Sequence, residues 1–409
     1  MTMSMGRAAV IVGLLAAIGP FAIDMYLPAM PAIAADLHTT AQGAQATLTS
    51  FFLAFGLTQV LYGPAADWFG RRPPIFFGLA LYILGALGAA AAPSIGWLIG
   101  ARLIQGFGAA STMVIPRAII RDLYTGVEAT KMMGFIMLVI SVSPILAPTV
   151  GGLLISAFGW RSVFIAVLLT AALAFYLTAF QLPETLDPKS RQPLRFGAIF
   201  ASYFDLMKDR RFLGLTFIGG AGMASFFAFL AASPFLFIEH YGLSTNQFGM
   251  AFGFNAAGFI GASQLAAPLA QRFGVEATVR GAVAGFAAFA LSMAAAFAAG
   301  VDGLGALIAF LFLTFACLGL VIGPTMVLAL DEQGERAGLA SALGGALQMV
   351  AGIVSIGLVS LSPKGDPMGL ALVVAGAAVV AAALTLGTLG WGGAGQANAV
   401  VKPQGNAVS

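Results

Sequence analysis

Long apolar stretches alternate with short polar segments along almost the whole chain. Each stretch is roughly 20 residues long, which is the length that an α-helix needs to cross the hydrocarbon core of a bilayer. We therefore expect an all-α integral membrane protein. The pattern predicts twelve spanning helices, near 9–29, 45–66, 75–92, 97–120, 131–157, 161–181, 211–237, 247–271, 277–299, 303–328, 336–358 and 367–390.

The longest polar stretch divides these helices into two sets of six. Its second part is amphipathic and is expected either to lie along the membrane surface or to form a flexible loop. In the first case Phe196, Ile199, Phe200 and Phe204 would face lipid. The predicted organisation is a six-helix bundle at 1–181, a cytoplasmic central loop at 182–210, a second six-helix bundle at 211–390 and a cytoplasmic tail at 391–409.

Composition and charge placement agree with this architecture. Hydrophobic residues make up 60% of the chain and charged residues 9%, whereas a soluble domain carries about 25% charged residues. Of the 19 Lys and Arg residues, sixteen fall on one side of the predicted spans, two fall on the other and one, Arg102, lies within a span. Cytoplasmic segments carry the excess of basic residues, so both termini are expected in the cytoplasm. The net charge of +3 is scattered through loops and does not indicate a nucleic-acid partner.

A charged hairpin joins the second and third predicted spans. Residues 63–73 read Gly-Pro-Ala-Ala-Asp-Trp-Phe-Gly-Arg-Arg-Pro. An ordinary cytoplasmic loop would explain the two arginines, but not an acid four residues after a glycine at the membrane edge. The stretch resembles the G-x-x-x-D-[RK]-x-G-R-[RK] loop of the major facilitator superfamily, with Trp68 in place of the usual basic residue. The matching residues are Gly63, Asp67, Gly70, Arg71 and Arg72.

This resemblance implies the major facilitator fold, in which two pseudo-symmetric six-helix halves bind substrate between them. A weak internal repeat supports it, because residues 64–70 are echoed by residues 268–274 without the acid or the tandem arginines. The resemblance also implies that the hairpin takes part in gating. Asp122, at the end of the fourth span, would complete a charge relay with the hairpin or would belong to a solvated interfacial cluster, while Asp67 would face the start of the eleventh span.

Two ionisable residues, Asp24 and Arg102, are expected clearly inside the hydrocarbon. Each lies about five residues from the outer end of its span, which places both roughly 7–8 Å below the membrane edge. An intramembrane charge is costly and is a functional hypothesis by default. The matching depth predicts a proton site at Asp24 that Arg102 approaches in one conformation, or a permanent ion pair that orients two helices. The absence of further buried charge argues against strongly charged substrates.

Flanking motifs narrow the resemblance to the Bcr/CflA branch of drug:proton antiporters. Residues 22–31 resemble its I-D-x-Y-L-P-A-x-P signature, and residues 102–108 resemble the R-x-x-Q-G-x-G motif of the fourth span. The resemblance implies that Asp24 carries the proton and that Arg102 couples it to transport. The fifth span resembles the antiporter motif G-x-x-x-G-P-x-x-G-G, with Ser143 and Ala147 in place of its two leading glycines. Pro148, Gly151 and Gly152 match the motif, and Pro144 adds a second proline to this stretch.

The predicted function is proton-coupled efflux of drug-like amphiphiles across the bacterial inner membrane. The alternative within transport is export of a metabolite such as an amino acid or sugar. An integral-membrane enzyme or receptor is disfavoured, because no catalytic motif and no ATP-binding P-loop is present. No cofactor is expected, and the proton gradient would supply the energy. The expected partners are the substrate, protons and lipid. The family resemblance implies a monomer. Candidate cavity residues are Gln105, Phe226, Phe227, Phe229, Asn255 and Gln348, although an aromatic stripe at helical spacing is more often packing or lipid contact.

Overall fold

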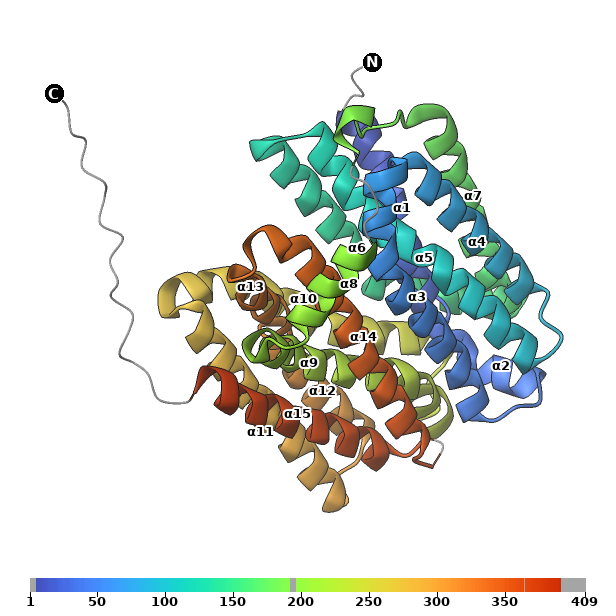
Figure 1. Ribbon diagram of the computed structural model, residues 1–409. Helices are drawn as coiled ribbons and strands as arrows, with labels where there is room; N and C mark the ends of the chain where they lie inside the picture. The colour runs from blue at the N-terminus through green and yellow to red at the C-terminus, as the bar shows by residue number, and fades with distance from the viewer. Residues whose placement is uncertain (1–4, 192–195, 364, 391–409) are drawn as a thin grey trace.

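The computed structural model describes residues 5–191, 196–363 and 365–390, which are helical along most of their length and contain no strand. Figure 1 shows two helical bundles packed side by side. We call α1–α7 the first bundle and α9–α15 the second bundle. The first contains α1 (Met5–Asp24), α2 (Met30–Asp36), α3 (Ala41–Phe69), α4 (Arg72–Ala90), α5 (Ile95–Leu123), α6 (Gly126–Phe158) and α7 (Arg161–Gln181). The second contains α9 (Arg210–Pro234), α10 (Thr245–Phe273), α11 (Val275–Ala298), α12 (Leu304–Gly319), α13 (Ile322–Asp331), α14 (Ala337–Ser360) and α15 (Pro367–Leu389).

Short polar side chains and glycines set the helix ends. Thr40, Ser94 and Ser244 cap α3, α5 and α10 by accepting a hydrogen bond from a backbone N–H of the first turn, which satisfies a donor that has no partner within the helix. Gly70 and Gly274 end α3 and α10 with φ angles of 94° and 87°, a region that residues with a Cβ rarely adopt. The sequence therefore specifies tight reversals at equivalent positions of the two bundles.

In the described part of the chain, eleven helical segments are long and apolar enough to cross a membrane. The remaining expected span, the eighth at 247–271, coincides with α10, which is 29 residues long but more polar than the others because it carries several amide side chains. All twelve expected segments therefore coincide with long helices, and most of these extend beyond the apolar core at one or both ends. Two of them are interrupted: the first by a short 3-10 turn, Leu27–Ala29, and the tenth between α12 and α13.

The two bundles meet along two helix pairs, α6 with α10 and α3 with α14. Glycines permit this contact, because a Cβ at Gly152 would lie 2.8 Å from the Thr245 carbonyl oxygen and a Cβ at Gly249 would lie 2.9 Å from Thr149 Cα. An aromatic contact also crosses the interface, since the rings of Phe52 and Phe227 stack with centroids 4.1 Å apart. The small side chains that the sequence places in its spans thus serve close packing between bundles.

The two ends of the molecule differ in how the bundles meet. We call the end that holds residues 69–72 the hairpin end, and the end that holds residues 36–41 the far end. At the far end Gln45 Nε2 donates to the Ala231 carbonyl at 3.0 Å, and Ser360 Oγ donates to Gln45 Oε1 at 2.8 Å. At the hairpin end a cavity of about 500 Å³ separates α3 and α5 from α14. The bundles are therefore sealed together at one end and parted at the other.

The central connection contains one helix, α8 (Phe196–Leu206), which packs against α14. Its Tyr203 and Leu206 side chains are buried, and Phe204 is 64% exposed. The amphipathic segment predicted between the bundles is thus a helix, and one of its faces packs on protein. The side chains of Phe196, Ile199 and Phe200, and the predicted tail at 391–409, lie outside the described residues.

Candidate functional site

Asp24 lies where the first span is broken. It is the last residue of α1, and the chain turns through Met25 and Tyr26 before helical structure resumes. Its side chain is buried, and its Oδ2 accepts a hydrogen bond of 3.0 Å from Ser143 Oγ of α6. A buried carboxylate needs such a partner, because burial without one is costly. The sequence identified this acid but not the helix break that holds it.

Arg102 is completely buried in α5, within a cage of aromatic rings. Its guanidinium carbon lies 4.3 Å from the centroid of the Phe51 ring and 4.6 Å from that of Tyr26, and such cation–π contacts partly compensate a buried cation. Its Nη1 donates to Gln105 Oε1 at 2.6 Å and to the carbonyl of Ala22 at 3.4 Å. Its Nε and Nη2 have no hydrogen-bond partner among the described residues.

Asp24 and Arg102 belong to helices that touch one another, but their side chains are not paired. Arg102 reaches the backbone of α1 at Ala22, two residues before Asp24, whereas the Asp24 carboxylate contacts Ser143. No ion pair joins the two side chains, both of which the structure describes. The permanent ion pair considered above is thus not present in this conformation. The Nε and Nη2 groups of Arg102 are unused donors, and they would be available to the Asp24 carboxylate if the two side chains approached one another.

The antiporter-like motif of α6 touches both bundles. Ala147 and Pro148 are buried, and Pro144 is half-buried. A Cβ at Gly151 would lie 3.0 Å from the Cα of Met25, the residue after Asp24, and Gly152 faces α10 of the second bundle. Helix α6 runs unbroken from Gly126 to Phe158 in spite of its two prolines. It therefore links the surroundings of Asp24 to the interface between the bundles.

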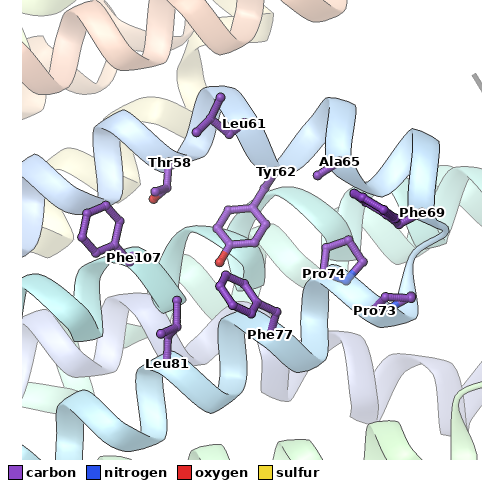
Figure 2. Close-up of a pocket in the computed structure, with 10 residues that line it drawn as sticks. All are labelled: Thr58, Leu61, Tyr62, Ala65, Phe69, Pro73, Pro74, Phe77, Leu81 and Phe107. Carbon is purple, nitrogen blue, oxygen red and sulfur yellow. The ribbon is translucent and has the colours of Figure 1, made fainter. Parts of the chain in front are cut away.

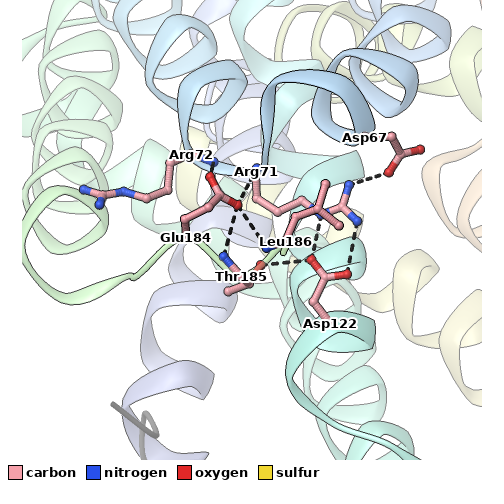
Figure 3. A network of polar contacts seen from close by, with 7 residues as sticks. All are labelled: Asp67, Arg71, Arg72, Asp122, Glu184, Thr185 and Leu186. Atoms are coloured by element: carbon pink, nitrogen blue, oxygen red, sulfur yellow. Dashed lines mark hydrogen bonds and ion pairs between the residues drawn. The ribbon is translucent and has the colours of Figure 1, made fainter. Parts of the chain in front are cut away.

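The charged hairpin forms a dense network, which Figure 3 shows. Arg71 is 4% exposed and lies between two acids. Its Nη1 is 2.5 Å from Asp67 Oδ1, and its Nε and Nη2 bind the two oxygens of Asp122 at 2.7 Å and 3.1 Å. Such a two-pronged arginine–carboxylate contact fixes orientation as well as contributing energy. Asp122 thus contacts the hairpin directly, while Gly63 and Asp67 line the cavity that also borders the start of α14.

Glu184 is a member of this network that the sequence did not single out. Its carboxylate accepts the backbone N–H groups of Arg71 at 2.8 Å and Arg72 at 3.1 Å, and also those of the next two residues of its own segment. A Cβ at Gly70 would lie 2.6 Å from Glu184 Oε2, so the glycine leaves room for the acid. Glu184 belongs to the Pro-Glu-Thr sequence after α7, which lies more than a hundred residues from Arg71 along the chain. Sequence spacing therefore gave no indication that the two residues are in contact.

The candidate cavity residues of the second bundle are mostly packed. Phe227 and Phe229 are buried in an aromatic cluster, and Phe226 is half-buried against Phe259 and Phe315. Asn255 Oδ1 and Gln348 Nε2, like Gln105 Nε2 of the first bundle, are buried without a hydrogen-bond partner in the described part of the chain. These three amides therefore retain free hydrogen-bonding capacity in the protein interior.

The cavity at the hairpin end is lined by a cation that lies near the cytoplasmic end of the fourth expected span. Arg117 lies within α5, one and a half turns before the helix ends, and its half-buried side chain lines this cavity together with Arg121. Arg117 is thus a further cation that faces the protein interior, and the expectation that Asp24 and Arg102 are the charges clearly inside the hydrocarbon stays a prediction. Helix α5 extends beyond its apolar core, so that its last turns face the space between the bundles.

A second cavity, of about 610 Å³, lies on the outside of the first bundle between α3, α4 and α5 (Figure 2). Its walls are almost entirely apolar, and the large side chains of Leu61, Phe69 and Phe77 at its border are at least half exposed. The side chains of Thr58 and Tyr62 supply its polar atoms. It is suited to contact with lipid and offers few groups that could orient a polar ligand.

At the far end, Asp36 joins the first span to the start of α7. Its carboxylate accepts hydrogen bonds from Arg161 Nη1 at 2.8 Å and from Trp160 Nε1 at 3.0 Å. These two hydrogen bonds attach α2 to the start of α7.

Comparison with known proteins decides the family. Residues 12–356 match the family model described as Major Facilitator Superfamily. The chain belongs to the Major Facilitator Superfamily. It is 33% identical over 383 residues to a protein of Haemophilus influenzae named bicyclomycin resistance protein homolog, with 91% of this chain and 93% of that protein covered. It is 32% identical over 242 residues to multidrug resistance protein D of Escherichia coli, with 58% of this chain and 60% of that protein covered.

The fold agrees with this membership in the Major Facilitator Superfamily. The crystal structure of a nucleoside transporter aligns with a TM-score of 0.74 at 17% identity, over 94% of this chain and all of the transporter chain. The expected family and fold are therefore confirmed, and the chain is a multi-pass membrane protein of a transporter family. The roles of individual residues remain predictions.

Proposed function

We propose that this protein exports drug-like amphiphiles in exchange for protons across the bacterial inner membrane. The observation that carries the proposal is the buried carboxylate of Asp24, hydrogen-bonded to Ser143 within the antiporter-like motif. A carboxyl group inside a membrane protein and close to a bundle interface is suited to bind and release a proton during the transport cycle. The names of the relatives, which refer to bicyclomycin and multidrug resistance, support drugs as the cargo.

The two ends of the molecule suggest how exchange is organised. The excess of basic residues in the segments of the hairpin end supports a cytoplasmic location for that end and for both termini. The cavity between the bundles would then be reached from the cytoplasm, while the bonds of Gln45 and Ser360 close the opposite side. Alternating access requires that these bonds break as the hairpin end closes.

The charges near Asp24 provide a coupling mechanism. When Asp24 is ionised, the unused donors of Arg102 would be attracted to it, and rearrangement of the broken segment between α1 and α2 would bring them together. When Asp24 is protonated, this attraction is lost. The energy source is the proton gradient, the partners are substrate, protons and lipid, and the working unit is a monomer.

Drug-susceptibility profiling tests this function. A bacterial host that lacks its own efflux pumps is made to express the wild-type chain or Asp24→Asn, with equal membrane levels checked by immunoblot. We expect the wild type to raise the inhibitory concentration of several amphiphilic drugs and Asp24→Asn to abolish the increase. A wild-type chain that protects against no drug, while efflux of an amino acid or sugar rises, would replace drug export with metabolite export.

A further inference from the structure

Three of the side chains that line the cavity at the hairpin end each carry a buried polar atom that has no partner among the described residues. The atoms are Arg117 Nε of α5, Gln59 Oε1 of α3 and the hydroxyl of Tyr203 in α8. The three side chains come from separate elements and border one space of about 500 Å³. Buried polar groups are normally hydrogen-bonded, and several side chains with unpaired polar atoms around one cavity indicate a site for a ligand.

The charge of this cavity is positive. Arg117 and Arg121 lie one helical turn apart on α5, and no ion pair is found for either within the described residues. Asp67 also lines the cavity, but its carboxylate is bound to Arg71, which also binds Asp122. The two arginines of α5 are therefore free to attract an anionic group.

Apart from Ser341, the remaining lining residues are apolar, and they belong to both bundles. Val114 and Met133 come from α5 and α6, and Leu339 comes from α14. The Gln59 side chain reaches across the interface, since a Cβ at Gly345 would lie 3.3 Å from its Nε2. A ligand held here would thus contact both bundles, with apolar surface around its body and polar groups at one side.

We propose that this cavity is a binding site for amphiphilic organic anions, with Arg117 as the residue that recognises a carboxylate. The guanidinium offers a planar set of donors that matches a carboxylate, and the Tyr203 hydroxyl and Gln59 supply further hydrogen bonds. The inference that the bound anion is cargo captured before export rests on the proposed function. It also revises the expectation that a lack of buried charge excludes charged substrates.

Binding of a matched pair of probes tests the site. Naphthoate and naphthamide share one aromatic body and differ in charge, and their affinities for the purified full-length chain can be measured by isothermal titration calorimetry. We expect the wild type to prefer naphthoate. Arg117→Gln should weaken naphthoate binding by about 10- to 100-fold, the loss typical of a hydrogen bond to a charged group, and should leave naphthamide binding nearly unchanged. Arg117→Lys should retain part of the preference.

A matched control separates this site from general electrostatics. Arg272→Gln removes a cation at the end of α10, where the guanidinium lies 5.2 Å from the Phe273 ring and outside the cavity, and it should bind naphthoate like the wild type. Tyr203→Phe, on the surface helix α8, should weaken naphthoate several-fold and carries the test if Arg117→Gln does not fold. Equal affinity of wild type, Arg117→Gln and Tyr203→Phe for naphthoate would overturn the proposal, as would a wild-type preference for naphthamide.

The same probes distinguish failure of the site from failure of the function. If the preference for naphthoate depends on Arg117 but the chain exports no drug and no naphthoate, the site is supported and the proposed export is contradicted. If the chain exports drugs but its affinity for naphthoate does not depend on Arg117, the proposed function is supported and the site is contradicted.

Discussion

The hydroxyl of Ser143 lies 3.0 Å from Oδ2 of Asp24 and donates a hydrogen bond to it. This contact joins the break after α1 to α6, the helix whose Gly152 packs against α10 of the second bundle. A change in the charge of Asp24 therefore alters a hydrogen bond to α6, which forms part of the bundle interface. We regard this connection as the structural basis for coupling protons to the movement of the bundles.

Removing the Ser143 hydroxyl should impair transport. In Ser143→Ala the ionised Asp24 carboxylate loses its one hydrogen bond from another helix, and loss of a bond to a charged group corresponds to about 10-fold or more. We expect the efflux rate in everted membrane vesicles to fall by that factor at equal protein levels. Ser143→Thr keeps a hydroxyl at this position and should retain most of the rate. Wild-type efflux by Ser143→Ala would show that the hydrogen bond is dispensable.

Alanine at Gly70 should destabilise the protein more than alanine at Gly274. Both glycines end a helix with a positive φ, and backbone strain of this kind costs about 1–3 kcal/mol for other residues. At Gly70 the added Cβ would also meet Glu184 Oε2 at 2.6 Å, whereas at Gly274 nothing lies within 4 Å. We expect a larger fall in the melting temperature, measured in detergent, for Gly70→Ala. Equal falls would mean that the Glu184 contact has no energetic weight.

The hairpin shows how far the sequence could predict a site. Asp67 and Arg71 lie four residues apart around the turn at Gly70, so their contact follows from local geometry. Asp122 lies 51 residues from Arg71 along the chain, and its contact with the hairpin was expected only from the family resemblance. Glu184 lies more than a hundred residues away along the chain, and only tertiary packing brings it to the backbone of Arg71. Sequence spacing cannot report such a contact.

The spans themselves were predictable for a simple physical reason. Each must be about 20 residues long and apolar, so hydropathy located all twelve helices. Hydropathy did not reveal the break after Asp24 or the cavity that Arg117 lines, because both depend on how the helices pack against one another. For the same reason, the depth of Asp24 and Arg102 in the membrane could not predict that the Asp24 carboxylate is bonded to Ser143.

Weakening the seal at the far end should favour the opposite arrangement of the bundles. Gln45→Ala removes the bonds to Ala231 and Ser360, each contributing about 0.5–1.5 kcal/mol. Spin labels on the far ends of α3 and α14, introduced into a chain whose one cysteine, Cys317, is replaced by alanine, should report a larger population of long distances. Gln42→Ala removes one exposed bond to the Ser360 carbonyl and should have a smaller effect. Unchanged distance distributions in Gln45→Ala would contradict the assigned seal.

Proton release on substrate binding tests the central claim most directly, namely that Asp24 carries the exchanged proton. The purified chain is placed in weakly buffered detergent solution with a pH indicator, and a drug to which it confers resistance is added. The wild type should release protons, and Asp24→Asn should release none while still binding the drug. Proton release by Asp24→Asn equal to that of the wild type would contradict the account.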